Sequence, residues 1–256
     1  MQKKYKAYFI DLDGTLYRGK EKIPAASRFI GRLRAAGIPF LVLTNNTTQS
    51  PETVARNLTA NYDMQIEPEN VYTAGLATAD YLKQLNLGHT VYAIGELGLK
   101  QALLDQGFSF AEYKPAYVVV GLDYDVTYHK FEKATLAIRR GAKFIGTNAD
   151  TNLPNERGLV PGAGSVIALV ERATQQRATY VGKPEPIMLK AALAHFGLKK
   201  SEALMVGDNY NTDIMAGINT GVDTLLVYTG YSKPEDIKKV AVKPTYEIMS
   251  LDQWQL

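Results

Sequence analysis

The sequence of 256 residues contains no cysteine, and it also lacks the long apolar stretches that mark secreted and membrane proteins. Without cysteine there is neither a disulfide framework nor a thiolate metal site, which suits a reducing compartment. Asp11 interrupts the first apolar stretch before the hydrophobic region of a signal peptide can form. No run approaches the ~18 apolar residues of a membrane span. We therefore expect a soluble, cytoplasmic protein with no membrane partner.

The sequence also lacks a strong excess of either charge. Lysine and arginine together number 29 against 26 acidic residues, which gives a formal net charge of +3, and no long basic run is interleaved with aromatic residues. Nucleic acid is therefore not an expected partner. Hydrophobic residues make up 46% of the chain, enough for a sizeable core, and the length allows one large domain or two smaller ones.

Two aspartates stand directly after the first apolar run. Asp11 and Asp13 belong to an Asp-Leu-Asp-Gly-Thr stretch that follows Tyr8-Phe9-Ile10. Because ligands bind at the carboxyl ends of strands in a parallel α/β sheet, this placement offers one carboxylate for attack and a second for proton transfer. An Asx turn that closes a strand is the alternative interpretation, since Asp and Gly are common turn residues.

Three other β-like runs end in polar side chains in the same way. The residues that follow them are Thr44 and Asn45, then Lys183, then Asp208 and Asn209, with Asp213 shortly after. Taken singly, each has an ordinary structural explanation: a turn, a solvated lysine at a helix entry, or an acidic residue that meets a helix dipole. Four such motifs in this order, with a long gap after the second, form a specific pattern.

In this order and context the motifs resemble those of the haloacid dehalogenase (HAD) superfamily, and in detail its NagD-like branch (class IIA, with a C2-type cap), which includes acid sugar phosphatases. The resemblance covers the whole chain. It implies an α/β fold, with a doubly wound, parallel, Rossmann-type core and an inserted α/β cap domain. It also implies a Mg²⁺-dependent phosphatase that hydrolyses small phosphorylated metabolites, such as sugar and acid-sugar phosphates, and aryl phosphates in vitro.

The resemblance further implies how the reaction is divided among the residues. Asp11 would attack phosphorus and form an aspartyl phosphate, which splits one difficult displacement into two easier ones. Asp13 would protonate the departing oxygen and then take a proton from the hydrolytic water. Thr44, Asn45 and Lys183 would bind the phosphoryl group.

For the metal, the resemblance implies a site made of Asp11, Asp208 and the carbonyl oxygen of Asp13. Asn209 and Asp213 would support this site through water or through hydrogen bonds to the ligands. Two like charges about 4 Å apart cost roughly 4 kcal/mol at an effective dielectric constant of 20. Converging carboxylates therefore need cationic compensation.

Strand-like and helix-like segments alternate along the chain, which predicts a parallel, right-handed, doubly wound sheet. From about residue 90 a complete strand-helix set begins in which no strand ends in a phosphate-type motif. We expect this set to be the inserted cap, which selects the substrate. The predicted division is a catalytic core of residues 1–78 and 179–256 and a cap of residues 79–178, with the strand at Thr179 resuming the core sheet.

Two other functions use similar residues. Response-regulator receivers also combine a phosphorylatable aspartate, Mg²⁺, a threonine and a lysine on a doubly wound sheet, but Asp13 and the long insertion count against a receiver. A phosphomutase would share every core residue and would return the phosphoryl group to a bound sugar instead of water. The expected partner is a small-molecule phosphate ester, and the pattern favours no particular oligomeric state.

Overall fold

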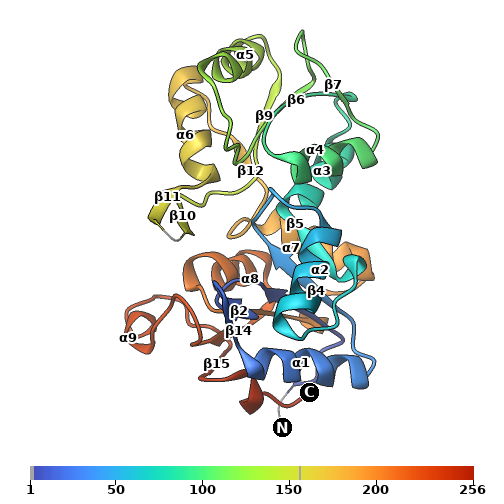
Figure 1. Cartoon of the computed structure of the whole chain (residues 1–256), viewed down its shortest axis with the longest axis vertical. Coiled ribbons are helices and arrows are strands. Elements are labelled where there is room, and N and C mark those ends of the chain that lie inside the picture. Colours follow the sequence, from blue (N-terminus) through green and yellow to red (C-terminus); the bar gives the residue numbers. More distant parts are fainter. Residues whose placement is uncertain (1–2, 156) are drawn as a thin grey trace. The chain divides into compact units, whose positions relative to one another are not determined.

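The structure is a computed structural model that describes residues 3–155 and 157–256, and the chain divides into two compact units (Figure 1). Unit 1 comprises Met1–Thr44, Pro51–Tyr72 and Lys183–Leu256, and unit 2 comprises Asn45–Ser50 and Thr73–Gly182. Within the described part of the chain, no helix is both long and apolar enough to cross a membrane.

Unit 1 contains a six-stranded sheet with the order β15-β14-β13-β1-β4-β5. Its strands are β1 (Ala7–Asp11), β4 (Phe40–Thr44), β5 (Val71–Thr73), β13 (Ala203–Gly207), β14 (Asp223–Val227) and β15 (Tyr246–Ile248). The pairings of β1 with β4 and β13, of β13 with β14 and of β14 with β15 are all parallel. Parallel pairing brings the carboxyl ends of β1, β4 and β13 to one edge of the sheet, where the predicted site residues lie.

Helices cover both faces of this sheet. They are α1 (Pro24–Ala35), α2 (Pro51–Tyr62), α7 (Pro186–Phe196), α8 (Met215–Thr220) and α9 (Pro234–Ile237). Side chains alternate along β1, so Tyr8 packs in the same core as Phe29 of α1 and Leu58 of α2, whereas Phe9 stacks on Phe196 of α7 at 6.4 Å. A short hairpin, β2 (Tyr17–Arg18) and β3 (Glu21–Lys22), follows β1, and four short helical turns complete the unit: η1 (Pro68–Asn70), η2 (Lys200–Glu202), η3 (Tyr210–Ile214) and η4 (Leu251–Gln253).

Unit 2 contains its own parallel sheet with the order β12-β9-β8-β6-β7. The strands are β6 (Thr90–Ile94), β7 (Ser109–Phe110), β8 (Tyr117–Val120), β9 (Lys143–Gly146) and β12 (Thr179–Tyr180), and the helices are α3 (Ala74–Leu85), α4 (Leu97–Asp105), α5 (Tyr128–Arg139) and α6 (Ala163–Thr174). Val118 and Val120 of β8 pack against Ile138 of α5 and Ile167 of α6. The hydroxyl of Tyr117 donates to the carbonyl of Leu82 at 3.1 Å, which ties the end of α3 to β8.

The prediction of a doubly wound α/β protein is confirmed, and the structure differs from the expected elements at three places. β12 pairs with β9 in the unit 2 sheet, so the strand at Thr179 does not resume the core sheet. The boundaries between the units fall near residues 72 and 182 instead of 78 and 178. The first boundary precedes residue 78 because α3 runs unbroken through that residue. The segment 45–50 also belongs to unit 2. The helix α6 and the hairpin of β10 (Asn152–Asn155) and β11 (Gly158–Pro161) were not expected, because glycine and proline dominate the segment from 158 to 164.

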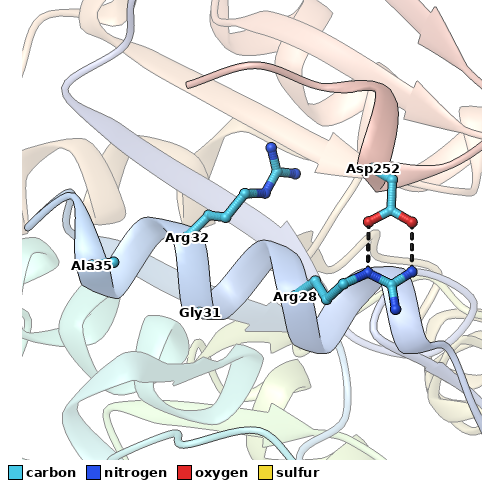
Figure 2. Close-up of a pocket in the computed structure, with 5 residues that line it drawn as sticks. All are labelled: Arg28, Gly31, Arg32, Ala35 and Asp252. Carbon is cyan, nitrogen blue, oxygen red and sulfur yellow. Dashed lines mark hydrogen bonds and ion pairs between the residues drawn. The ribbon is translucent and has the colours of Figure 1, made fainter.

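The C-terminal turn η4 packs on α1 through a paired charge (Figure 2). Arg28 donates from Nε and Nη2 to the two carboxylate oxygens of Asp252 at 2.9 and 2.5 Å. A cavity of about 420 Å³ lies here and is also lined by Gly31, Arg32 and Ala35. None of the predicted site residues lines it.

Beside this ion pair, Trp254 fills the core of unit 1. Its side chain is only 3% exposed, and its Nε1 donates to the hydroxyl of Tyr8 at 3.1 Å. Arg32 donates to the carbonyl oxygen of Trp254 at 2.5 Å, which fixes the chain end over the core. The buried indole, more than the exposed ion pair, should therefore anchor the C-terminus.

We predict that Trp254→Ala lowers the free energy of unfolding by about 3–5 kcal/mol, because it leaves a cavity in the core. Arg28→Ala should shift the unfolding midpoint far less, because an exposed ion pair adds little stability when water can solvate the two charges separately. Urea denaturation followed by far-UV circular dichroism measures both variants. Tryptophan fluorescence cannot be used, because Trp254 is the one tryptophan of the chain and Trp254→Ala removes it. Equal losses in the two variants would contradict this view of the C-terminus.

Candidate functional site

Four charged side chains come together at the carboxyl ends of β1 and β13 in unit 1. Asp11 ends β1, Asp208 directly follows β13, Asp213 lies in the π-helical turn η3, and Lys183 precedes α7. One carboxylate oxygen from each of the three aspartates lies within 4.8 Å of the other two. The structure thus brings together predicted residues from three of the four sequence motifs.

Lys183 is the cation of this cluster. It is 1% exposed, and its Nζ donates to Asp11 Oδ1 at 2.5 Å, to Asp213 Oδ1 at 2.8 Å and to the carbonyl oxygen of Leu43 at 3.1 Å. Burial alone would lower the pKa of Lys183, but the carboxylates of Asp11 and Asp213 outweigh burial and raise it. Lys183 is therefore a buried ammonium ion, and the interpretation as a solvated lysine is wrong.

One ammonium group leaves the three carboxylates with an excess of negative charge. Burial, followed by repulsion from Asp213, raises the pKa of Asp11 well above its usual value, while Lys183 opposes the rise. Burial and then Asp213 also raise the pKa of Asp208, to about 6. A buried group of carboxylate oxygens with surplus negative charge is the donor set that a hard divalent cation such as Mg²⁺ takes, so these residues fit a metal.

Two hydrogen bonds and two closely approaching glycines fix the position of the Asp208 carboxylate. Oδ1 accepts from the Thr15 hydroxyl at 3.1 Å, and Oδ2 accepts from the backbone N–H of Tyr231 at 2.6 Å. A Cβ atom at Gly14 would lie 2.4 Å from Oδ2, and one at Gly230 would lie 2.0 Å from it. Both positions must therefore be glycine for Asp208 to occupy its place.

Sequence reasoning gave no role to Thr15, Gly230 or Tyr231. Thr15 was part of the first motif, but its bond to Asp208 joins residues 193 positions apart. Gly230 and Tyr231 come shortly after β14 at the same edge of the sheet, so the rule that identified the other motifs also applies there. Neither residue has a charged side chain. Tyr231 contributes a backbone N–H group to Asp208, and Gly230 leaves room for the Asp208 carboxylate.

Asp213 is buried and holds other parts of the site in place. Besides Lys183, it accepts from the backbone N–H of Asn209 at 3.1 Å and from the Thr212 hydroxyl at 3.2 Å. The side chain of Asn209 accepts from the N–H of Asn211 at 3.0 Å and so caps the turn η3. Asp213 is therefore not a surface charge that meets a helix dipole.

Asp13 lies outside the three-carboxylate cluster and is exposed. Its Oδ1 accepts from the backbone N–H of Gly19, in the turn of the β2–β3 hairpin, at 3.1 Å. The carbonyl of Gly19 in turn accepts from the Tyr62 hydroxyl at 2.7 Å, and the Tyr62 ring stacks on Tyr17 at 4.4 Å. The hairpin thus orients Asp13 while leaving it open to solvent.

Thr44 and Asn45 mark a change of unit. Thr44 ends β4 in unit 1 and is buried, whereas Asn45 begins the segment of unit 2 that follows it. The Asn45 side-chain amide donates to both oxygens of Asp150, at 3.1 and 3.2 Å, and the backbone carbonyl oxygen of Asn45 accepts from the Asn148 side chain at 2.8 Å. The side chain of Asn45 is therefore held by unit 2.

Comparison with known proteins gives a consistent set of similarities. Residues 8–109 match the family model described as haloacid dehalogenase-like hydrolase, and residues 180–254 match one described as HAD-hydrolase-like. The chain is 46% identical over 252 residues to the 5'-nucleotidase YutF of Bacillus subtilis, with 98% of each chain covered. It is 47% identical to the acid sugar phosphatase of Staphylococcus aureus, covering 98% of this chain and 97% of the relative. NagD from the E. coli K-12 strain superposes with a TM-score of 0.93 at 31% identity, with 99% of each chain covered.

We predict that Gly230→Ala weakens Mg²⁺ binding by about 10- to 100-fold, because the added methyl group displaces the Asp208 carboxylate. Isothermal titration with Mg²⁺ measures the affinity. Gly31→Ala is the matched control, since a Cβ atom at Gly31 meets nothing within 4 Å. Unchanged Mg²⁺ affinity in Gly230→Ala would show that Asp208 does not hold the metal.

Proposed function

Since the chain belongs to the haloacid dehalogenase-like hydrolases and is a NagD-like phosphatase of that family, we propose that it hydrolyses small phosphorylated metabolites with Mg²⁺ and an aspartyl-phosphate intermediate on Asp11. The substrates proposed are acid-sugar and sugar phosphates, with aryl phosphates as substrates in vitro. The name of the S. aureus relative supports the first class. The observation that carries the proposal is the buried contact between Lys183 and Asp11, beside two further carboxylates.

Asp11 is the proposed nucleophile because of how its two oxygens differ. Oδ1 is fixed by Lys183 at 2.5 Å, while the partner of Oδ2, the Thr15 hydroxyl, stands at 3.5 Å. We assign the attack on phosphorus to Oδ2. A bond forms between Oδ2 and phosphorus as the ester P–O bond breaks, and water then cleaves the aspartyl phosphate to release inorganic phosphate.

Asp13 is the proposed acid and base. Its exposed carboxyl group would give a proton to the departing alkoxide and then accept one from the attacking water. The hydrogen bond from Gly19 orients one oxygen of Asp13, which leaves the other for proton transfer. Such general acid-base help is worth about 10²- to 10⁴-fold in rate.

The remaining residues would neutralise and orient the phosphoryl group. We propose that the Thr44 hydroxyl, the Asn45 backbone N–H and Lys183 bind its oxygens. Mg²⁺, held by Asp11, Asp208 and the carbonyl oxygen of Asp13, would supply positive charge beside the same oxygens. Asn209 and Asp213 would keep the ligands in place, as their hydrogen bonds within η3 support.

Unit 2 is the proposed cap, which selects the substrate. All the residues proposed for the chemistry lie in unit 1 except Asn45, which stands at a crossing between the units. Unit 2 nevertheless has a sheet, helices and a core of its own. An inserted unit of this kind has no role in a receiver domain, which argues against that alternative. A phosphomutase would differ from a phosphatase in returning the phosphoryl group to a sugar instead of water.

We predict that Asp11→Asn abolishes turnover, because an amide cannot attack phosphorus, and that Asp13→Asn lowers kcat by about 10²- to 10⁴-fold. Hydrolysis of p-nitrophenyl phosphate measures both, and circular dichroism checks the fold. Asp252→Asn is the matched control, because it makes the same chemical change at a surface ion pair.

A panel of natural esters then tests the substrate class. Sugar-acid phosphates, sugar phosphates, nucleoside 5'-monophosphates and pyridoxal phosphate should be compared by kcat/KM with release of inorganic phosphate. The first two should be preferred. Retention of about a tenth of activity in Asp11→Asn, or phosphoryl transfer to a sugar without phosphate release, would refute the proposed mechanism.

A further inference from the structure

Unit 2 contains a strongly basic groove that is lined by none of the residues proposed for catalysis. It has a volume of about 910 Å³ and lies where the chain enters β8, β9 and β12, at the amino ends of these strands. Five of its lining residues are cations, and none is an acid: Lys114, Arg139, Arg140, Lys143 and Arg177. We call this cavity the basic groove.

Two other cations of unit 2 pair with carboxylates, whereas the cations of the basic groove make other contacts, such as that of Lys114 Nζ with the Tyr113 ring at 5.3 Å from its centre. Lys130 pairs with Asp123 at 2.9 Å and Lys133 with Glu112 at 2.6 Å. In the described part of the chain, no cation of the basic groove forms an ion pair with a carboxylate. Arg139 donates to the carbonyl oxygen of Ala173 at 2.9 Å, so one of the five serves to join α5 to α6.

Helix ends explain only part of this charge. The C-termini of α5 and α6 carry roughly half a negative charge each, which offsets about one of the five cations. The rest come from separate connecting segments, before β8, at the start of β9 and before β12. All five cations are exposed, so their mutual repulsion is screened by water and is weak, and a bound anion would still relieve it.

The shape and the lining favour a small molecule over a nucleic acid. The volume falls within the range of about 300–1,000 Å³ that is typical of small-molecule sites. Phe144, the aromatic residue of the lining, is only 4% exposed and offers no platform for a stacked base. Arginine pairs with phosphate oxygens through two parallel hydrogen bonds, and three of the five cations are arginines.

We propose that the basic groove binds a small polyphosphate, such as a tripolyphosphate group free or on an organic carrier. All the lining residues belong to unit 2, so the site shares no residue with the carboxylate cluster of unit 1. Its occupancy does not depend on Asp11 or on the metal. Binding should weaken steeply with salt, because the groove is exposed.

The test is calorimetric titration of the full-length protein with sodium tripolyphosphate in EDTA, where the metal-free carboxylate cluster of unit 1 repels anions. The wild-type protein should bind one tripolyphosphate. Arg140→Gln/Lys143→Gln should bind at least about tenfold more weakly, because the two substitutions remove two of the five positive charges that line the groove. Lys83→Gln/Lys100→Gln, which removes two cations of α3 and α4, should bind like the wild type.

Citrate and a short DNA duplex complete the comparison, and thermal unfolding verifies that both double variants are folded. Weaker binding of citrate than of tripolyphosphate supports the phosphate assignment, and equal or tighter citrate binding overturns it. The proposal also fails if tripolyphosphate does not bind, if both double variants weaken equally, or if only DNA binds.

Discussion

The site depends on one electrostatic constraint: two buried carboxylates, Asp208 and Asp213, and the partly buried Asp11 lie together beside a single ammonium group. Lys183 satisfies Asp11 and Asp213 directly, at 2.5 and 2.8 Å, but it does not balance the charge of Asp208 as well. Burial first, and repulsion from Asp213 second, raise the pKa values of Asp11 and Asp208. A divalent cation would relieve the excess of negative charge, and a phosphoryl group could then approach a carboxylate that would otherwise repel it. The acids, the lysine and the proposed metal therefore form one interdependent unit.

The fold meets this constraint through parallel strands and absent side chains. Parallel pairing of β1 with β13 brings Asp11 and Asp208 to the same edge, although they are far apart in the sequence. Gly14 and Gly230 leave the space that the Asp208 carboxylate occupies, and the N–H of Tyr231 meets one of its oxygens. Asp13, by contrast, is held at the surface by the hairpin turn at Gly19. The buried acids and the exposed acid thus have environments suited to different proposed tasks.

Much of this arrangement follows from a simple sequence rule, that polar residues after β-like runs gather at one sheet edge. The rule explains the convergence of Asp11 and Asp208, which end or follow β1 and β13 of one sheet, with Asp213 shortly after. The same rule also predicted Lys183, although the strand before it, β12, belongs to the sheet of unit 2. It did not identify Gly230 and Tyr231, whose contributions are space and a backbone N–H group. It also misplaced β12, because a two-residue strand carries no pattern that tells which of two sheets it joins. The bond between Asn45 and Asp150 joins residues 105 positions apart and leaves no local signal.

The most direct test of the charge constraint is the thermal unfolding midpoint of the wild type and of Asp208→Asn at pH 7.5, each in EDTA and in saturating Mg²⁺. At this pH Asp208, with a pKa of about 6, is ionised in the folded protein. An asparagine can still accept from Tyr231, so the substitution mainly removes one negative charge. We expect the metal-free variant to unfold at a higher temperature than the metal-free wild type. Mg²⁺ should stabilise the folded wild type by about 2.7 kcal/mol at 100 times its Kd, which raises the unfolding temperature. The unfolding temperature of the variant should not change with Mg²⁺. A metal-free wild type at least as stable as Asp208→Asn, together with equal Mg²⁺ shifts, would contradict the account.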